Sequence, residues 1–193
     1  AKRASVIDLV GITCSSFRME HAKRFIKECE PAVIKGNGSE IRAMAGTAFH
    51  GTGVDVSAAD AVTAKDPDTV HSMAHIAKEL AKETGAVVMV TGEVDIIASP
   101  KNDSVYTIYN GSPNMAKVTG TGCMLTCITG TYLAVTYALD ACILAALTLD
   151  CAGEYAYAAK GLGTYHMELI NQLSLMDETK IAQLANMQVL SIK

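Results

Sequence analysis

Short apolar runs alternate along this chain with longer amphipathic segments, and this alternation constrains the fold more than any other feature of the sequence. Residues 6–10, 32–35 and 86–90 are apolar runs of strand length, and helix-like segments such as 18–28 separate them. Strands that alternate with helices in this way form a mostly parallel sheet with helices on both faces. The sequence therefore predicts an α/β fold, with residues 86–90 as a central strand.

Two of the predicted helices have clear signals at their ends. Asp66 precedes Pro67, and an acidic cap followed by proline at the first helical position predicts a helix that runs to Gly85. Residues 37–45 predict a shorter helix, because Gly46 follows them and glycine readily adopts the left-handed backbone that ends a helix. A polar, glycine-containing loop is expected between the two helices.

The pattern changes after the central strand. Residues 94–99 and 105–110 are short apolar runs on either side of a Pro-Lys-Asn-Asp-Ser turn, which is typical of a β-hairpin. An antiparallel pair of strands can be added to the edge of a largely parallel sheet. We therefore expect this hairpin at one edge of the sheet.

From residue 121 onward the chain is predicted to be largely helical. Residues 123–152 are apolar, but threonines and Asp140 interrupt the run, so two buried helices with a cap at Asp140 fit better than a membrane span. Asp177 is predicted to cap a further helix. No repeat or linker divides the chain, and residues 1–193 are expected to form a single domain.

The charge and the cysteines argue against several functional classes. With a formal net charge of −4, the chain has no basic surface suited to nucleic acid or to an anionic membrane. None of the six cysteines belongs to a Cys-x-x-Cys pair, and no secretory leader is recognised, so a reducing cytoplasm is expected. Cys127, Cys142 and Cys151 lie in apolar helical segments and are interpreted as small core residues.

Polar residues follow the parallel strands at the points where each strand is predicted to end. In open α/β sheets the ligand binds at this edge, so residues far apart in the sequence are expected to meet there. The residues that share this position are Asp8, Lys35 with Asn37 and Glu40, Thr91, and the turn of residues 120–123. Their shared position favours a ligand site more strongly than any one of them does.

Each of these side chains has a functional and a structural interpretation. Asp8 lies inside an apolar strand, where a carboxylate is costly unless it is paired or holds a cation such as Mg²⁺; a purely structural carboxylate is equally compatible. Glu40 is interpreted either as a second oxygen ligand or as a solvated helix glutamate. Lys35 could bind a polyphosphate or lie on the surface, and Thr91 could contact a phosphate or cap a turn.

The segment from Lys117 to Leu125 combines a glycine-rich turn with the start of a long apolar helix. Gly120 and Gly122 allow the backbone to turn sharply and to bring its N–H groups close to a ligand. The unpaired N–H groups at the start of the helix favour an anion such as phosphate. Cys123 is expected in the first helical turn, where a thiolate forms more easily, although cysteines in apolar helices are commonly core residues.

Four stretches, taken together, resemble the hydroxyethylthiazole kinase family of the ribokinase-like superfamily. They are VIDLVG at residues 6–11, VIKGNGSEI at 33–41, VTGEVD at 90–95 and KVTGTGCML at 117–125. The residue after Gly-Thr-Gly is commonly Asp in sugar and pyrimidine kinases and Cys in thiazole kinases, and here it is Cys123. The resemblance extends over nearly the whole chain.

The resemblance implies a ribokinase-like three-layer α/β sandwich with a mostly parallel central sheet. It also implies an enzyme of thiamine salvage that transfers the γ-phosphoryl group of ATP to the hydroxyl of 4-methyl-5-(2-hydroxyethyl)thiazole. The implied site residues are Cys123 for catalysis, Gly120, Thr121 and Gly122 for the substrate and the anion hole, Lys35, Thr91 and Asn37 for ATP, and Asp8 and Glu40 for Mg²⁺.

The resemblance further implies a cytoplasmic homotrimer without nucleic-acid or membrane partners. The sequence differs from the usual family pattern at Leu9, where proline is common, and at Lys35, where arginine is common. The family's N-terminal segment has no match here, so the chain is expected to correspond to the family domain without that portion. The alternatives are a related small-alcohol kinase of the hydroxymethylpyrimidine type and a truncated, non-catalytic nucleotide-binding homologue.

Overall fold

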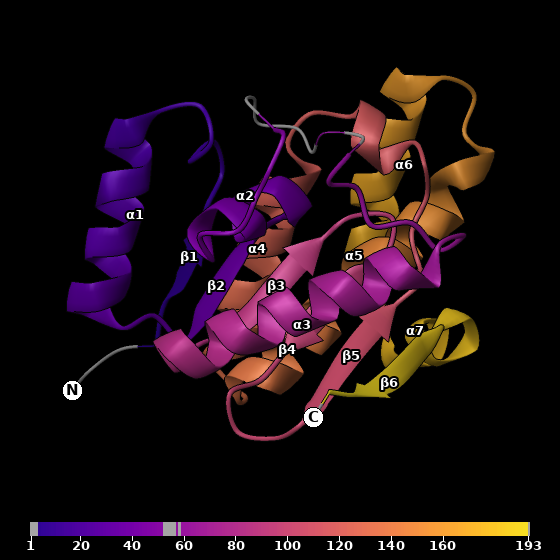
Figure 1. Ribbon diagram of the computed structural model, residues 1–193. Coiled ribbons are helices and arrows are strands. Elements are labelled where there is room, and N and C mark those ends of the chain that lie inside the picture. The colour runs from indigo at the N-terminus through magenta and orange to yellow at the C-terminus, as the bar shows by residue number, and fades with distance from the viewer. Residues whose placement is uncertain (1–3, 52–56, 58, 193) are drawn as a thin grey trace.

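A six-stranded sheet lies between two sets of helices, which gives the fold three layers (Figure 1). The computed structural model describes residues 4–51, 57 and 59–192. The strands lie in the order of the sequence and are β1 (Val6–Asp8), β2 (Val33–Asn37), β3 (Val87–Thr91), β4 (Asp95–Ala98), β5 (Ser104–Ile108) and β6 (Met187–Ser191). Strands β1 to β3 are parallel, and each later strand is antiparallel to its neighbour.

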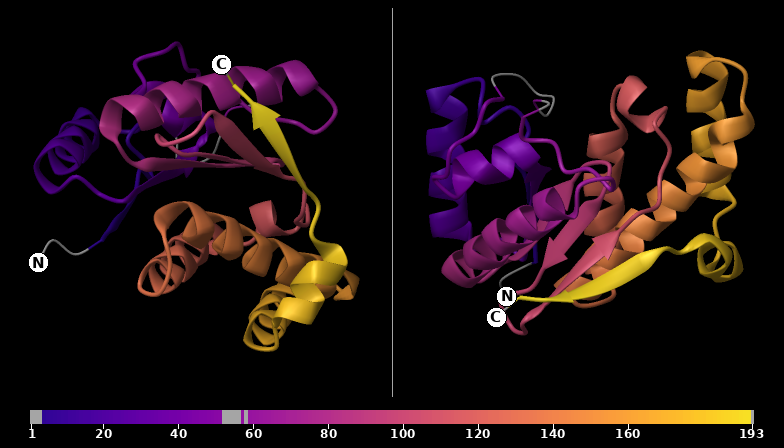
Figure 2. Two further views of the ribbon diagram at one scale, coloured as in Figure 1. Left: turned by 90° about the horizontal axis from the view of Figure 1, so that it is seen from below. Right: turned by 45° about the vertical axis from the view of Figure 1, so that its right-hand side comes forward.

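Helices cover both faces of the sheet (Figure 2). One face packs against α1 (Ser16–Cys29), α2 (Gly38–Met44) and α3 (Pro67–Thr84). The other packs against α4 (Thr121–Leu133) and α5 (Ala138–Tyr155), while α6 (Leu162–Ser174) and α7 (Glu178–Leu184) lie beside α5. Each face has its own cluster of buried apolar side chains, so the sheet is buried on both sides.

The predicted α/β architecture, with helices on both faces, is confirmed. The sheet is mixed in the described residues, because only β1, β2 and β3 are parallel. The predicted hairpin is present as β4 and β5, but it does not form the edge. Strand β6 pairs outside β5, and the expectation that the chain is largely helical beyond residue 121 missed this strand.

The predicted ends of α2 and α3 are confirmed. The Asp66 carboxylate accepts a hydrogen bond from the Asp68 N–H at 3.1 Å, and Pro67 is the first helical residue. Gly85 ends α3 and Gly46 follows α2, with φ angles of +73° and +68°. These are left-handed conformations that glycine adopts without strain.

The predictions for the apolar segment after residue 121 need two corrections. Helix α5 begins at Ala138 with Tyr137 at the cap position, so Asp140 lies inside the first turn and is not the cap. Cys142 and Cys151 are buried as expected, but Cys127 is exposed because it lies on the outer face of α4. Among the described residues, none of the helices has the length and apolar character needed to cross a membrane.

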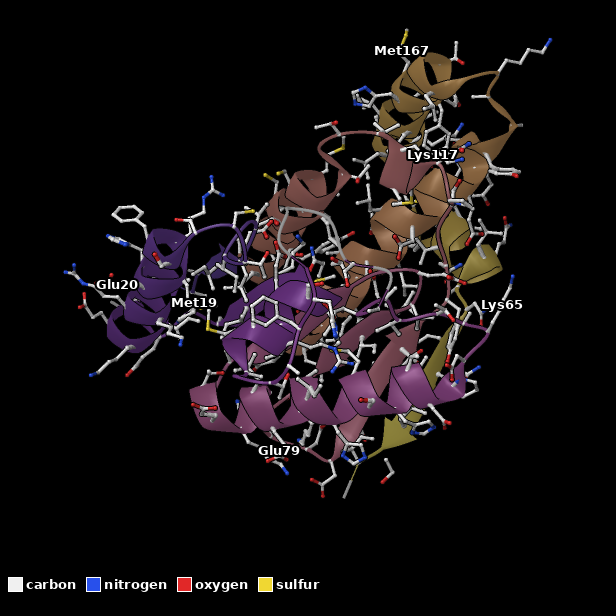
Figure 3. The ribbon with its side chains drawn as sticks, turned by 45° about the horizontal axis from the view of Figure 1, so that its top comes forward. Met19, Glu20, Lys65, Glu79, Lys117 and Met167 are labelled. Atoms are coloured by element: carbon white, nitrogen blue, oxygen red, sulfur yellow. The ribbon has the colours of Figure 1, made fainter. Side chains whose placement is uncertain are left out.

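The surface outside the packed faces carries charges of both signs. The Lys65 and Glu79 side chains point outward (Figure 3), and Lys117 is also exposed. Asp177 caps α7 as predicted, since its carboxylate accepts a hydrogen bond from the Lys180 N–H at 2.9 Å.

Helix α5 also supports the segment that leads into the glycine-rich turn. A short 3-10 helix, Met115–Lys117, precedes the turn, and the Met115 side chain packs directly on Gly153 of α5. A Cβ atom at Gly153 would lie 2.5 Å from the Met115 Sδ and 3.1 Å from the Tyr165 hydroxyl oxygen. Glycine at this position therefore allows the close approach of the two segments.

Replacing Gly153 with alanine should destabilise the protein, because the added methyl group overlaps Met115 and forces it to move. We expect a loss of about 1–3 kcal/mol in the free energy of unfolding, measured with urea. Gly130→Ala in α4 is the matched control, since nothing lies within 4 Å of its Cβ position. That change should be neutral or stabilise by up to about 1 kcal/mol. Equal effects of the two substitutions would contradict the close packing.

Candidate active site

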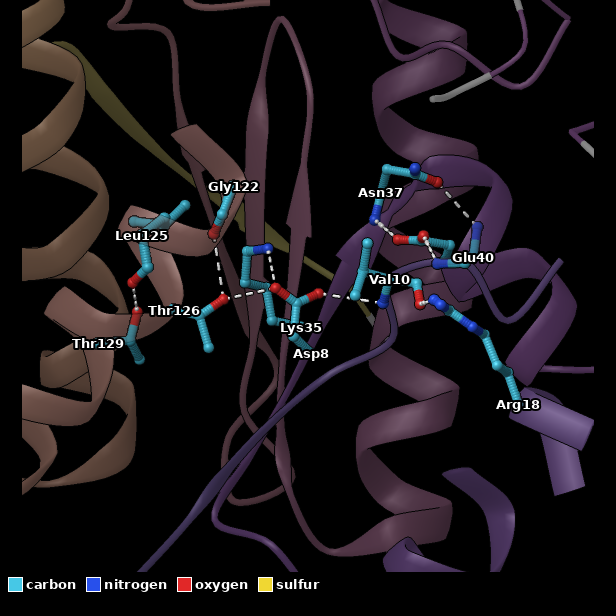
Figure 4. Close-up of polar contacts among 11 residues, drawn as sticks. Asp8, Val10, Arg18, Lys35, Asn37, Glu40, Gly122, Leu125, Thr126 and Thr129 are labelled. Atoms are coloured by element: carbon cyan, nitrogen blue, oxygen red, sulfur yellow. Dashed lines mark hydrogen bonds and ion pairs between the residues drawn. The ribbon is translucent and has the colours of Figure 1, made fainter. Parts of the chain in front are cut away.

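Strands β1 and β2 end in an ion pair at the carboxyl edge of the sheet. Asp8 and Lys35 are neighbours in the parallel register, and the Lys35 Nζ lies 3.0 Å from the Asp8 Oδ2. The lysine side chain is 4% exposed and the aspartate side chain 16% exposed, so the pair is largely desolvated. The Thr126 hydroxyl, from α4, donates to the same oxygen at 2.6 Å (Figure 4). A buried lysine is stable here because its charge is paired.

The glycine-rich turn places unpaired N–H groups next to this ion pair. Gly120 precedes α4 with a φ of +101°, and the Met124 N–H donates to the Gly120 carbonyl at 2.9 Å. Met124 is the first residue whose N–H bonds within the helix, so the N–H groups of residues 121–123 have no acceptor there. A Cβ atom at Gly122 would lie 3.6 Å from the Lys35 Nζ, so the ammonium group sits directly beneath the turn. The arrangement suits an anion.

Cys123 lies in the first turn of α4, as the sequence predicts, and it is exposed, so its alternative interpretation as a core residue is wrong. Its side chain therefore projects from the turn that carries the unpaired N–H groups. A ligand bound at these N–H groups can reach the thiol.

A second polar corner joins β2, α2 and the loop after β1. The Glu40 carboxylate accepts hydrogen bonds from the N–H groups of Gly11 and Asn37, both at 2.8 Å, and the Asn37 side chain accepts one from the Glu40 N–H at 3.0 Å. Glu40 is 3% exposed, so its interpretation as a solvated helix glutamate is wrong. Burial raises the pKa of Glu40, although the two N–H donors oppose that shift.

Thr91 ends β3 beside this corner. It is the register neighbour of Asn37, and it is half-buried. No hydrogen bond from its hydroxyl is formed to the described residues. Gly92 and Glu93, which follow, are exposed, so the end of β3 is open to solvent.

Two interacting buried carboxyl groups were not singled out from the sequence. Asp95 begins β4 and accepts a hydrogen bond from the Gly92 N–H at 3.0 Å. Burial raises the pKa of Asp95 to about 6, while the Gly92 N–H and the Lys35 charge oppose that rise. Burial, and then the charges of Asp95 and Glu154, raise the pKa of Asp150 in α5 well above its usual value. Asp95 and Asp150 together therefore retain a proton at pH values at which isolated carboxyl groups would be ionised.

The signal for these residues was present in the sequence. Asp95 and Asp150 each interrupt an apolar segment, which is the same feature that drew attention to Asp8. A single acidic residue in an apolar strand or helix indicates burial with a partner or a proton.

Helix α5 fixes the chain between β5 and the turn through a further carboxylate. Glu154 Oε1 accepts hydrogen bonds from Asn110 Nδ2 at 2.8 Å and from the Gly111 N–H at 2.9 Å. The Asn110 amide also contacts the main chain of residues 184 and 186, just before β6. Asn110 and Glu154 therefore join the end of β5, α5 and the segment that leads into β6.

Comparisons with known proteins identify the family. The sequence profile described as the hydroxyethylthiazole kinase family matches residues 1–179. Over 184 residues the chain is 42% identical to hydroxyethylthiazole kinase 2 of Clostridium botulinum, an alignment that spans 95% of the chain and 68% of that relative. The chain belongs to the hydroxyethylthiazole kinase family.

Further members and their structures agree with the fold. The hydroxyethylthiazole kinase of Clostridium acetobutylicum is 36% identical over 186 residues, which are 93% of the chain and 66% of that protein. The solved structure of the hydroxyethylthiazole kinase protein from Pyrococcus horikoshii OT3 has a TM-score of 0.82 at 28% identity and covers 97% of the chain and 66% of its own.

More distant kinases share the fold alone. The pyridoxal kinase of Staphylococcus aureus, solved with AMP-PCP and pyridoxal, has a TM-score of 0.58 at 14% identity over 98% of this chain and 63% of its own. The expected ribokinase-like fold is thus confirmed. The chain spans about two thirds of the length of the family relatives that it matches.

The buried Asp95 predicts a pH dependence of stability. Its pKa is higher in the folded state, about 6, than in the unfolded chain. The folded state therefore binds more protons between about pH 4 and pH 6, and the free energy of unfolding should fall as the pH rises through that range. In Asp95→Asn the fall should be smaller, although Asp150 retains a contribution of the same sign.

Urea unfolding between pH 4 and pH 7 measures this dependence. The exposed Asp68 in α3 provides the control, because Asp68→Asn removes one negative charge from the surface. The same slope in Asp95→Asn and in the unchanged protein would contradict the burial of a protonated carboxyl group.

Proposed function

We propose that this chain carries the phosphoryl-transfer site of an ATP-dependent hydroxyethylthiazole kinase. The observation that carries the proposal is the first turn of α4, where three N–H groups without a helical acceptor adjoin the Cys123 thiol and the Lys35 ammonium. Membership of the family and the names of its relatives support the thiazole alcohol as substrate. The implied reaction belongs to thiamine salvage.

The turn of residues 120–123 is the proposed anion hole for the migrating phosphoryl group. Phosphoryl transfer depends mainly on alignment and on the stabilisation of negative charge at the phosphoryl oxygens. The N–H groups of Thr121, Gly122 and Cys123 supply fixed donors without an acceptor to displace. The Lys35 ammonium beneath Gly122 adds positive charge on the inner side of the turn.

Cys123 is proposed to handle the proton of the substrate hydroxyl. As the alcohol oxygen forms its bond to the γ-phosphorus, the bond from that phosphorus to the β–γ bridging oxygen breaks and ADP leaves. The hydroxyl proton then passes to the Cys123 thiolate, which becomes a thiol. The exposed position of the thiol in the first turn of α4 supports this role.

Thr91 and Asn37 are proposed to contact ATP together with Lys35. Both lie at the carboxyl ends of neighbouring strands, at the edge where α/β sheets bind their ligands. The Thr91 hydroxyl, with no bond to the described residues, can donate to a phosphate oxygen.

Mg²⁺ that arrives with ATP would neutralise the β- and γ-phosphate oxygens. Asp8 fits a contact through water, because its carboxylate is partly exposed and already accepts from Lys35 and Thr126. Glu40 fits an organising role, because each of its oxygens accepts a backbone N–H. Among the described residues, no group of three or more His, Cys, Asp or Glu side chains is arranged to hold a metal alone. Ligands from ATP and water would therefore complete the site.

We also propose a cytoplasmic homotrimer, as the family resemblance implies. Val135 and Tyr137, between α4 and α5, are 82% and 83% exposed. Met167 on α6, 68% exposed, points away from the fold (Figure 3). Sedimentation equilibrium should give three times the mass of one chain, and a monomer at micromolar concentration would contradict the proposal. A cytoplasmic location agrees with the six free cysteines.

Cys123→Ala should slow phosphorylation of the thiazole alcohol by about a hundredfold while ATP binding, measured by calorimetry, changes little. Cys123→Asp should retain activity, because a carboxylate can accept the proton. Cys127→Ala is the matched control, since Cys127 is also exposed and lies one turn further along α4.

The assay uses the protein at the full length that its gene encodes, with ATP, Mg²⁺ and the thiazole alcohol. Equal turnover of Cys123→Ala and Cys127→Ala would assign Cys123 to packing. A folded protein that binds ATP without turnover would support a non-catalytic homologue, and preference for a hydroxymethylpyrimidine in competition would reassign the substrate.

A further inference from the structure

The Thr126 hydroxyl connects helix α4 to the end of strand β1. Its oxygen lies 2.6 Å from Asp8 Oδ2 and 3.1 Å from the Gly122 carbonyl oxygen (Figure 4). A hydroxyl carries a single proton, and the shorter bond to a charged acceptor is the stronger of the two. Thr126 therefore donates to Asp8 and fixes the separation between the helix and the strand.

The other threonines along α4 show that this bond is particular to Thr126. The hydroxyls of Thr129 and Thr131 donate to the Leu125 and Cys127 carbonyls at 2.8 and 2.9 Å, within the helix. In the part of the chain that the structure describes, the Thr126 hydroxyl is the one from α4 that reaches the sheet.

Lys35 shares the oxygen that Thr126 contacts. The Lys35 Nζ lies 3.0 Å from Asp8 Oδ2 and beneath Gly122, 3.6 Å from the position of a Cβ atom there. One carboxylate oxygen thus accepts from a helix hydroxyl and from the ammonium under the turn. A shift of that oxygen would move the ammonium relative to the N–H groups of the turn.

We propose that Thr126 is a positioning residue of the kinase reaction. Through Asp8, it sets the place of the Lys35 ammonium relative to the turn that carries Gly122 and Cys123. This inference rests on the proposed function. It follows from the dependence of phosphoryl transfer on alignment, where a displacement of about 1 Å far from the reacting atoms can lower the rate about a hundredfold.

Thr126→Val tests the role, because valine has the shape of threonine without the hydroxyl. We expect kcat to fall by about tenfold or more, while the KM for ATP changes by less than about threefold. Thr126→Ser keeps the hydroxyl and should stay within about threefold of the unchanged protein. Thr131→Val is the matched control, since exposed Thr131 bonds only within the same helix.

Three kinetic results would overturn the positioning role. They are an equal kcat for Thr126→Val and Thr131→Val, a change confined to KM, and a Thr126→Ser variant as slow as Thr126→Val.

A double-mutant cycle in urea tests the connection itself, without an activity assay. If Thr126 acts through Asp8, Thr126→Val should lower the free energy of unfolding when Asp8 is present. The same substitution should lower it less when Asp8 is already alanine. If Asp8→Ala does not fold, Asp8→Asn replaces it, because a neutral acceptor also weakens the bond. Equal losses in both backgrounds would overturn the connection.

The two measurements separate the failure of this inference from that of the proposed function. Coupling in the unfolding cycle with an unchanged kcat would leave a structural bond and overturn the positioning role. No turnover by the unchanged full-length protein would overturn the proposed function, and the positioning role with it. The unfolding cycle would still test whether the Thr126–Asp8 bond contributes to stability.

Discussion

A single carboxylate oxygen, Asp8 Oδ2, holds the site together. It accepts a charge-assisted hydrogen bond from Lys35 on the neighbouring strand and another from Thr126 on the covering helix. Because the Lys35 side chain is almost fully buried, its charge requires this partner. The sheet edge and the start of α4 are therefore fixed relative to each other. The anion-binding turn gains its orientation and its nearby positive charge from the same contact.

The other carboxyl groups around the site either accept backbone hydrogen bonds or are buried. Glu40 binds backbone N–H groups and shapes the loop after β1, whereas Glu154 fixes the chain after β5. Asp95 and Asp150 are buried, and desolvation favours their protonated forms. Asp8 pairs directly with Lys35. The turn of α4, with the Lys35 ammonium beside it, is suited to an anion such as a phosphoryl group.

Local signals in the sequence predicted much of the fold and of the site. The Asp66-Pro67 cap and the glycines after α2 and α3 act within one turn of backbone, so the sequence alone predicted where these helices begin or end. Strand β6 could not, because its residues are mostly exposed and its stability comes from pairing with β5 far away in the sequence. The start of α5 was misplaced for a related reason: packing of its apolar residues on the sheet lets the helix begin before Asp140.

The sequence by itself determined the α/β pattern, the glycine-rich turn with its cysteine, and the strand ends where polar residues gather. These features depend on backbone preferences and on the alternation of apolar residues, which act over short distances. Only the tertiary structure decided which polar groups meet. It paired Lys35 with Asp8 and brought Thr126 to the same oxygen from far along the chain. It also buried Glu40, because desolvation depends on what packs around a group rather than on its neighbours in sequence.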